Sequence, residues 1–431
     1  MPPGEAIAGD GPMPRGDAPP QEDGTPTVER ADDPPALLES EGPVASPQAD
    51  GTEGAGERRP ENGTGDRAPI VQEPAAGATT PLDQPQEAVP APARTLGPLD
   101  QQLLALRDPI RRTMALYYRQ MLNTRDHTPA ELLAVARAFG VDTKVRQGAP
   151  NGSEVNAVTA LCWNTPAAGR ELLTVARGHL AARVGYGFQQ QPSELLAVLA
   201  MARVSPEYPM RAGDQVGTVA DLIEFEKLDC RSGSNLSMKL VGLSLYLDTD
   251  ATWTNAAGET WSIERMVAEE LARRPDETTA AAVDRLIGLS AAVNQRINDG
   301  KPVDGHFARA REHLREYQEY VFSLQNPEGD WHPRFLAARG GGAPPLDHLQ
   351  STARILQWLV ISLRDEELED PRVVRAVERV HTLLQQPQGQ GPWNAANLST
   401  RDLTSVYNAV HALLVYDQRV FVARELQSAS R

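Results

Sequence analysis

The first 96 residues of this 431-residue chain lack every aromatic residue, histidine, lysine and cysteine. They contain instead 18 of the chain's 35 prolines, and 18 acidic residues against 6 arginines. A segment with so little apolar surface cannot bury enough area to offset the entropy that it would lose on ordering. Residues 1–96 are therefore predicted to form a disordered, acidic, proline-rich tail.

The rest of the chain lacks a strong net charge, because residues 97–431 contain 40 acidic and 36 basic residues. No basic patch is found there, which argues against a nucleic-acid partner. The negative net charge of the whole chain lies almost entirely in the tail, so it gives no information about what the folded part binds. We expect one large folded domain at 97–421, followed by a short C-terminal tail at 422–431.

Targeting signals and long apolar runs are also missing. Met1 is followed by Pro-Pro-Gly-Glu instead of a basic and then an apolar region, and no run approaches the roughly 18 apolar residues of a membrane-spanning helix. A cytoplasmic protein without a membrane span is expected. Membrane anchoring stays open as an alternative if the true start lies upstream.

Two cysteines, Cys162 and Cys230, are too few for a disulfide framework or for a cysteine zinc site. The sequence therefore predicts neither a metal nor a cofactor.

Helical patterns dominate from residue 96 onward, and strand patterns hardly occur. Residues 96–122 are amphipathic, and Thr128, Pro129 and Glu131 form a helix-starting capping box. A similar Glu-Leu-Leu segment recurs at 131–137, 171–177 and 194–200. Helices this short cannot bury a face alone, so the recurrence predicts stacked helical hairpins. The alternative is that Glu-Leu-Leu-Ala is simply common in helices.

A glycine followed by an aromatic residue recurs where helices are expected to turn. Glycine allows a positive φ at the chain reversal, and the ring can wedge between neighbouring helices. The aromatic residues lie 73, 70 and 62 residues apart, which fits a repeated helical unit. The pairs are Gly185 with Phe188, Gly258 with Trp261, Gly329 with Trp331, and Gly391 with Trp393.

Residues 315–331 are the best-preserved of these segments. They read R-E-Y-Q-E-Y-V-F-S-L-Q-N-P-E-G-D-W, and they resemble the QW repeat of squalene cyclases and related prenyltransferases. Glu316 departs from the pattern, which usually has Gly or Ala there. Residues 375–393 form a decayed copy in which Gln386 is one residue out of register. The matching residues are Arg315, Tyr320, Val321, Gln325, Gly329 and Trp331.

The resemblance implies an all-α fold, an α/α toroid in which outer and inner helices alternate around a ring. Gln325, Gly329 and Trp331 would then be structural residues that link neighbouring outer helices. Residues 346–363 and 406–416 are apolar nearly all round, as inner helices should be, whereas residues 306–324 are amphipathic.

A narrower group of bacterial toroid proteins, common in planctomycetes, is similar to the chain over most of residues 218–421. Members of that group often carry a Cys-Gly-Gly-Thr-His-Arg segment, where this chain has Ala-Ala-Val-Asp-Arg at 281–285. Any chemistry that depends on that Cys and His is therefore lost here. The matching blocks begin at Cys230, Met238, Thr252 and Tyr416.

Candidate catalytic residues follow from the chemistry of the resembling families. Cyclases protonate an alkene with an Asp-x-Asp-Asp cluster, and Asp248 with Asp250 is the nearest equivalent, although a solvated turn is the alternative. Prenyltransferases bind zinc through Asp, Cys and His. Cys230, next to Asp229, is the corresponding weak candidate, with a buried structural thiol as the alternative.

Polar residues on the expected inner helices are the candidates for lining a central cavity. His348 and Thr352 lie one turn apart, and Thr404, Asn408 and His411 form a stripe on another helix. Helix capping and hydrogen bonds between helices are the alternative roles.

Two functions follow. The first is a non-catalytic scaffold that binds an apolar, isoprenoid-like small molecule or a protein partner. The second is a terpenoid cyclase or prenyltransferase-like enzyme that acts on an isoprenoid in the ring cavity.

Overall fold

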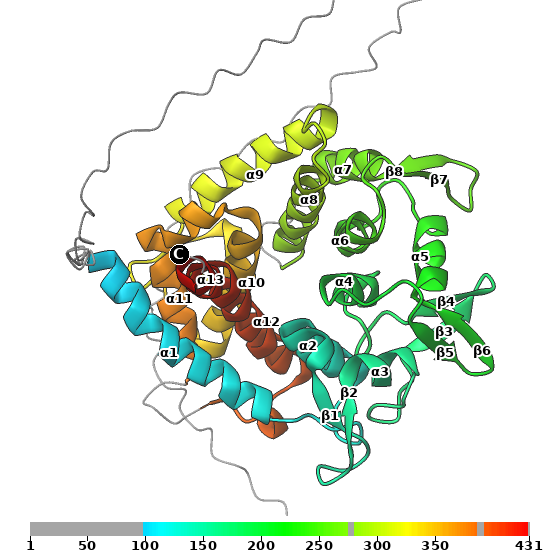
Figure 1. The fold of residues 1–431 in the computed structure, drawn as a ribbon, viewed down its shortest axis with the longest axis horizontal. Coiled ribbons are helices and arrows are strands. Elements are labelled where there is room, and N and C mark those ends of the chain that lie inside the picture. Colours follow the sequence, from blue (N-terminus) through cyan, green and yellow to red (C-terminus); the bar gives the residue numbers. More distant parts are fainter. Residues whose placement is uncertain (1–97, 275–279, 386–391, 430–431) are drawn as a thin grey trace, which may run out of the picture.

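Helices dominate the computed structural model, which describes residues 98–274, 280–385 and 392–429 (Figure 1). The predicted tail at 1–96 lies outside these ranges. The helices are α1 (Pro98–Arg119), α2 (Pro129–Phe139), α3 (Ala157–Cys162), α4 (Glu194–Met201), α5 (Val219–Leu228), α6 (Ser237–Tyr246), α7 (Ile263–Ala272), α8 (Ala280–Asn298), α9 (Gly305–Ser323), α10 (Pro345–Ser362), α11 (Pro371–Leu384), α12 (Thr400–Tyr416) and α13 (Ala423–Ala429). Short 3-10 turns are η1 (Gly140–Asp142), η2 (Phe335–Ala337), η3 (Asp365–Glu369) and η5 (Ala395–Asn397).

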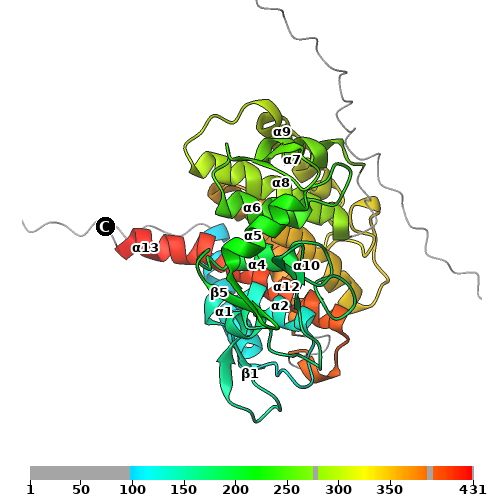
Figure 2. The ribbon, with the colours of Figure 1, turned by 90° about the vertical axis from the view of Figure 1, so that its right-hand side faces the viewer.

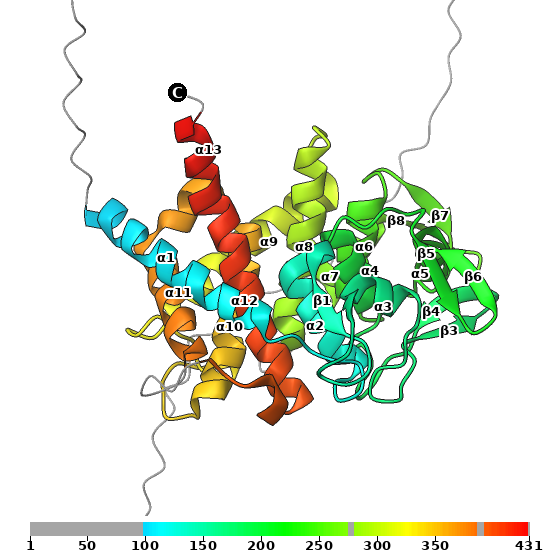
Figure 3. The same ribbon diagram turned by 60° about the horizontal axis from the view of Figure 1, so that its bottom comes forward.

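The end of the chain departs from regular α-helix. A π-helical segment, η6 (Asp417–Val422), joins α12 to α13, and α13 projects from the rest of the domain (Figures 2 and 3). Helix α13 therefore lies within the segment predicted as a C-terminal tail. Among the described helices, none combines the length and the apolarity needed to cross a membrane.

The even-numbered helices pack against one another in chain order. Helix α2 contacts α4, α4 contacts α6, α6 contacts α8, α8 contacts α10, and α10 contacts α12, which returns to α2. The odd-numbered helices α1, α7, α9 and α11 contact this group from outside (Figure 1). Helices α10 and α12 are buried over most of their surface, whereas α9 has an exposed charged face, as the hydrophobic patterns predict.

Strands are more frequent than the sequence predicts. Within the described residues, four antiparallel hairpins, each of two strands, contact helices α3, α5 and α7. The strands are β1 (Lys144–Arg146) with β2 (Glu154–Asn156), β3 (Leu173–Ala176) with β4 (His179–Ala182), β5 (Pro209–Ala212) with β6 (Gln215–Thr218), and β7 (Thr252–Thr254) with β8 (Thr260–Ser262).

The prediction of a helix at 171–177 is wrong, because β3 occupies this segment. The two residues that follow it, Arg177 and Gly178, have φ angles of 54° and 81°. Two successive positive φ angles form the tight turn that matches the twist of a hairpin. The similar sequence segments at 131–137 and 194–200 do form helices, α2 and α4.

The repeated glycine-aromatic pairs do not all mark the same structure. Gly258 lies in the β7–β8 hairpin, where Trp261 is the direct cross-strand partner of Trp253. The expected turn between helices is therefore wrong at this position. Gly391 lies outside the described residues.

The turn at Gly329 links α9 to α11. Gln325 Nε2 donates hydrogen bonds to the Gly329 carbonyl at 3.0 Å and to the Arg372 carbonyl at 2.9 Å. Gly329 has a φ of 96°, and a Cβ there would lie 2.5 Å from the backbone oxygen of Arg375. Trp331 is fully buried, and its Nε1 donates to the Val321 carbonyl at 2.8 Å.

A second link joins α11 to α1. Trp393 Nε1 donates to the Leu383 carbonyl at 2.9 Å, ten residues upstream, as Trp331 does in the first turn. Gln385 Nε2 donates to Thr113 Oγ1 at 3.0 Å. Gln385 thus contacts α1, while Gln386 lies outside the described residues.

Candidate functional site

Charged and polar side chains meet in the middle of the even-numbered helices. Arg137 of α2 donates to Asn408 Oδ1 of α12 at 3.0 Å and forms an ion pair with Glu194 of α4. Arg354 of α10 forms an ion pair with Asp284 of α8. All five side chains are buried, and each guanidinium has a carboxylate partner. We call these residues the central network.

The network continues along α10 and α12. Arg354 donates to Gln357 Oε1, and Gln357 Nε2 lies 2.7 Å from His411 Nδ1. Burial, with Arg137 and Arg354 nearby, lowers the pKa of His411 to about 3. The imidazole of His411 is therefore neutral at physiological pH.

Two cavities lie on opposite sides of the central network. The inner cavity, near the amino ends of α4, α6, α8 and α12, has a volume of about 60 Å³, which leaves room for only a few water molecules. The bowl, at the carboxyl ends of the even-numbered helices, has a volume of about 650 Å³. Each of these helices supplies an apolar residue to the bowl: Phe139, Met201, Leu245, Ala291, Ile361 and Val415.

The three candidates on α12 lie around these cavities. Thr404 and Asn408 line the inner cavity, and His411 lines the bowl. Thr404 Oγ1 also donates to the Thr400 carbonyl of its own helix at 2.8 Å. Thr404, Asn408 and His411 thus form one polar face of α12, which extends from the inner cavity to the bowl.

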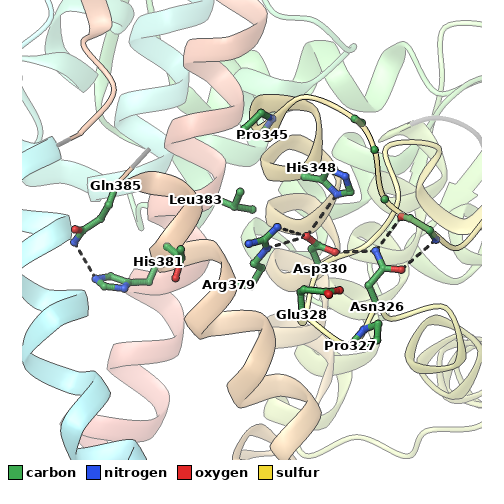
Figure 4. Close-up of a pocket in the computed structure, with 15 residues that line it drawn as sticks. Asn326, Pro327, Glu328, Asp330, Pro345, His348, Arg379, His381, Leu383 and Gln385 are labelled. Carbon is green, nitrogen blue, oxygen red and sulfur yellow. Dashed lines mark hydrogen bonds and ion pairs between the residues drawn. The ribbon is translucent and has the colours of Figure 1, made fainter. Parts of the chain in front are cut away.

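His348 lies elsewhere, in a cleft of about 890 Å³ beside the Gly329 turn (Figure 4). Its Nδ1 lies 3.5 Å from Asp330 Oδ2, and Arg379 Nε and Nη2 donate to the same oxygen at 2.8 Å. Asn326 Nδ2 donates to Asp330 Oδ1 at 2.7 Å. We call this group the Asp330 cleft.

Thr352 supports the turn and does not line either central cavity. Its Oγ1 accepts a hydrogen bond from the Trp331 backbone amide at 3.2 Å, and Ser351 Oγ donates to the Trp331 carbonyl at 2.8 Å. For Thr352, the geometry matches the alternative role of a hydrogen bond between elements.

Asp248 and Asp250 form an exposed ion-paired turn. Both side chains are 63% exposed, and Lys301 contacts both carboxylates, that of Asp250 at 2.9 Å. A hydrogen bond from Lys301 holds the pKa of Asp248 below its ordinary range, and hydrogen bonds from Arg296 and then Lys301 do the same for the pKa of Asp250. Such carboxylates stay ionised and are unsuited to protonate an alkene.

Cys230 is a buried thiol beside a different ion pair. Burial raises its pKa to about 11, and Sγ lies 3.5 Å from the Glu226 carbonyl. Lys239 Nζ pairs with the Glu226 carboxylate at 3.1 Å. Among the residues that the structure describes, no group of three His, Cys, Asp or Glu side chains has the arrangement of a metal site.

Sequence reasoning missed most of the central network. Arg137 and Glu194 occur inside the recurring Glu-Leu-Leu segments, and Arg354 directly precedes the largely apolar stretch at 355–361. A charged residue in the middle of an apolar helix is the signal that could have identified them, because such a charge needs a buried partner.

Comparisons of the chain with protein-family models, with curated proteins and with solved structures gave no match. The resemblance to QW-repeat proteins therefore depends on the residues quoted above.

Proposed function

We propose that the chain is a non-catalytic α/α-toroid protein that binds a small apolar ligand in the bowl. The six even-numbered helices would be the inner layer of the toroid. The unbroken series of contacts from α2 to α12 and back to α2 supports this arrangement. The links from α9 to α11 and from α11 to α1 support a closed outer layer.

The observation that carries the proposal is the filled centre next to an open bowl, to which each even-numbered helix supplies an apolar residue. Arg137 with Glu194 and Arg354 with Asp284 occupy the middle, so a bulky ligand would have to bind at the carboxyl ends of the inner helices. A volume of about 650 Å³ lies within the range of small-molecule sites, roughly 300–1,000 Å³.

The alternative is a terpenoid cyclase or prenyltransferase-like enzyme. Such an enzyme needs a general acid, or groups that bind diphosphate, next to its isoprenoid. No Asp or Glu occurs among the described residues that line the bowl, and the buried carboxylates of the central network are paired with arginines. These features favour binding without catalysis.

Native mass spectrometry of the full chain, purified without detergent from the cells that make it, tests the proposal. Ala291 lies on the bowl wall, so Ala291→Trp would fill the site. Ala257 is exposed in the β7–β8 turn, so Ala257→Trp is the matched control.

We expect a non-covalent small-molecule adduct on the wild type and on Ala257→Trp, and none on Ala291→Trp. Three outcomes would overturn the proposal: the same adduct on all three proteins, an adduct on none of them, or a protein as the only occupant. Diphosphate release from farnesyl diphosphate, or a cyclised product from squalene, would establish the enzymatic alternative.

A further inference from the structure

The hydrogen-bond chain beneath the bowl determines which nitrogen of His411 carries its proton. Arg354 has only donors, so the atom of Gln357 that it contacts must be the amide oxygen. The amide nitrogen of Gln357 then donates to His411 Nδ1, at 2.7 Å. A neutral imidazole that accepts at Nδ1 carries its hydrogen on Nε2.

That hydrogen is available to a ligand. Among the described residues, none forms a hydrogen bond with His411 Nε2, and His411 lines the bowl. Because the ring is neutral, Nε2 is a donor without a formal charge. The floor of the bowl thus offers one oriented N–H group next to the apolar residues that the even-numbered helices supply, which is how small-molecule sites fix the orientation of a ligand.

The electrostatics of the bowl disfavour an anionic ligand. The two buried guanidinium groups near its floor, those of Arg137 and Arg354, are both paired with carboxylates. The carboxyl ends of the inner helices surround the site, and helix carboxyl ends carry a partial negative charge. Arg203 is a lining residue with a charge, but it is exposed at the rim. An anion would therefore find no unpaired positive charge at the floor.

The chain irregularity beside the bowl supports a ligand site there. Helix α12 changes to the π-helical segment η6 at Asp417, and the next residue, Gln418, lines the bowl. Single π-helical turns are costly and occur frequently at functional sites. Asn294 of α8 also lines the bowl, and its Nδ2 donates to the Ile361 carbonyl at 2.8 Å, which orients that side chain.

We infer that the bowl binds a neutral, largely apolar molecule whose carbonyl oxygen accepts a hydrogen bond from His411 Nε2. This inference rests on the proposed function and adds the chemical class of the ligand. The carbonyl would reach the floor of the bowl, and the apolar body would lie against residues such as Phe139, Leu245 and Ile361.

Three probes of nearly equal shape test the inference by equilibrium dialysis against the full chain. They are 2-acetylnaphthalene, a neutral ketone; 2-ethylnaphthalene, which replaces the carbonyl with a methylene; and 2-naphthoate, an anion. His411→Phe removes the donor and keeps a planar ring. Gln357→Met removes the group that orients His411 without changing the bowl lining, and far-UV circular dichroism checks that each variant is folded.

We expect the ketone to bind the wild type more tightly than the naphthoate does. His411→Phe should weaken ketone binding roughly 2- to 12-fold, the value of one neutral hydrogen bond, and leave binding of the hydrocarbon unchanged. Gln357→Met should weaken ketone binding in the same direction, because the imidazole can then adopt the other tautomer. Ala291→Trp should abolish binding of all three probes.

Equal effects of His411→Phe on the ketone and on the hydrocarbon would overturn the inference, as would tightest binding of the naphthoate. If the hydrocarbon binds in the bowl without any preference for the ketone, the inference fails while the proposed function stands. If none of the probes binds but native mass spectrometry finds an adduct that Ala291→Trp removes, the ligand class is wrong and the site is right.

Discussion

Truncation of Trp331 tests whether the turn at Gly329 holds α9 and α11 together. The indole is fully buried, and its Nε1 donates to the Val321 carbonyl at 2.8 Å. The backbone bonds from Trp331 to Thr352 and from Ser351 to Trp331 do not involve the ring. Trp331→Ala would therefore remove the ring and its hydrogen bond while the main-chain contacts of the turn remain possible.

The expected loss in the free energy of unfolding follows from the burial of the Trp331 indole. Truncation of a buried tryptophan to alanine costs about 3–5 kcal/mol, through lost transfer free energy and the cavity that is left. Trp331→Phe keeps an aromatic ring but removes the hydrogen bond from Trp331 Nε1 to the Val321 carbonyl, which still accepts one from the Leu324 backbone amide at 3.1 Å. The loss of one such hydrogen bond costs about 0.5–1.5 kcal/mol. Trp163 is 46% exposed, so Trp163→Ala should change the free energy of unfolding by about 0.5 kcal/mol or less.

Urea unfolding followed by far-UV circular dichroism measures all three variants on the same scale. We expect the free energy of unfolding to fall in the order Trp163→Ala, Trp331→Phe, Trp331→Ala. If Trp331→Ala and Trp163→Ala unfold at the same urea concentration with the same slope, the turn is not a structural link and the reasoning is refuted.

Three further outcomes follow from the structure. Gly329→Ala should destabilise the fold by about 2 kcal/mol or more, because the added Cβ would clash with backbone and the positive φ is strained for alanine. Gly258→Ala should cost only about 1 kcal/mol, because no atom lies within 4 Å of the added Cβ. Equal urea midpoints for the two variants would contradict this. The Cys230 thiol, with a pKa raised to about 11, should react with a disulfide reagent at pH 8 only after unfolding, so fast labelling of the folded protein would be contrary evidence. Burial lowers the pKa values of His411 and His313 to about 3 and about 4, below the unfolded value of about 6.5, so the stability that the neutral rings contribute is complete above pH 6.5 and is lost on acidification. Each histidine should lower the free energy of unfolding by about 1 kcal/mol per pH unit between pH 6.5 and 5. A plot of urea midpoint against pH should therefore be flatter for His313→Phe than for the wild type.

The helices were predictable because their hydrophobic pattern has the helical period over many residues. Residues 306–324 and 346–363 correspond closely to α9 and α10, one amphipathic and one buried. At the Gly329 turn, Gly329 has the positive φ that glycine permits, and Gln325 and Trp331 each donate a side-chain hydrogen bond to a backbone carbonyl.

Hairpins were harder to predict because short segments carry little periodicity. The sequence at 171–177 is nearly the same as the segment at 131–137 in α2. It nevertheless forms β3, because the turn at Arg177 and Gly178 favours a hairpin. Local propensity is weak enough for such a turn and its packing to override it.

The central network was not predictable from spacing. Its partners lie far apart in the chain: Arg137 pairs with Glu194, and Arg354 with Asp284. Only the fold brings them together, and a lone charge in an apolar helix does not identify its partner. For the same reason His348 and His411 looked equivalent in the sequence, although one lines the Asp330 cleft and the other lines the bowl.

Nuclear magnetic resonance of the histidine rings is the most direct test of the ligand site. The chain has 8 histidines, so selective ¹⁵N labelling gives few signals, and the signal missing in His411→Phe identifies His411. We expect a neutral ring protonated at Nε2 down to pH 5, and a shift of that Nε2–H signal when 2-acetylnaphthalene is added but not when 2-ethylnaphthalene is added. A ring protonated at Nδ1, a charged ring at pH 6, or a ketone that shifts only other histidines would contradict the proposed site.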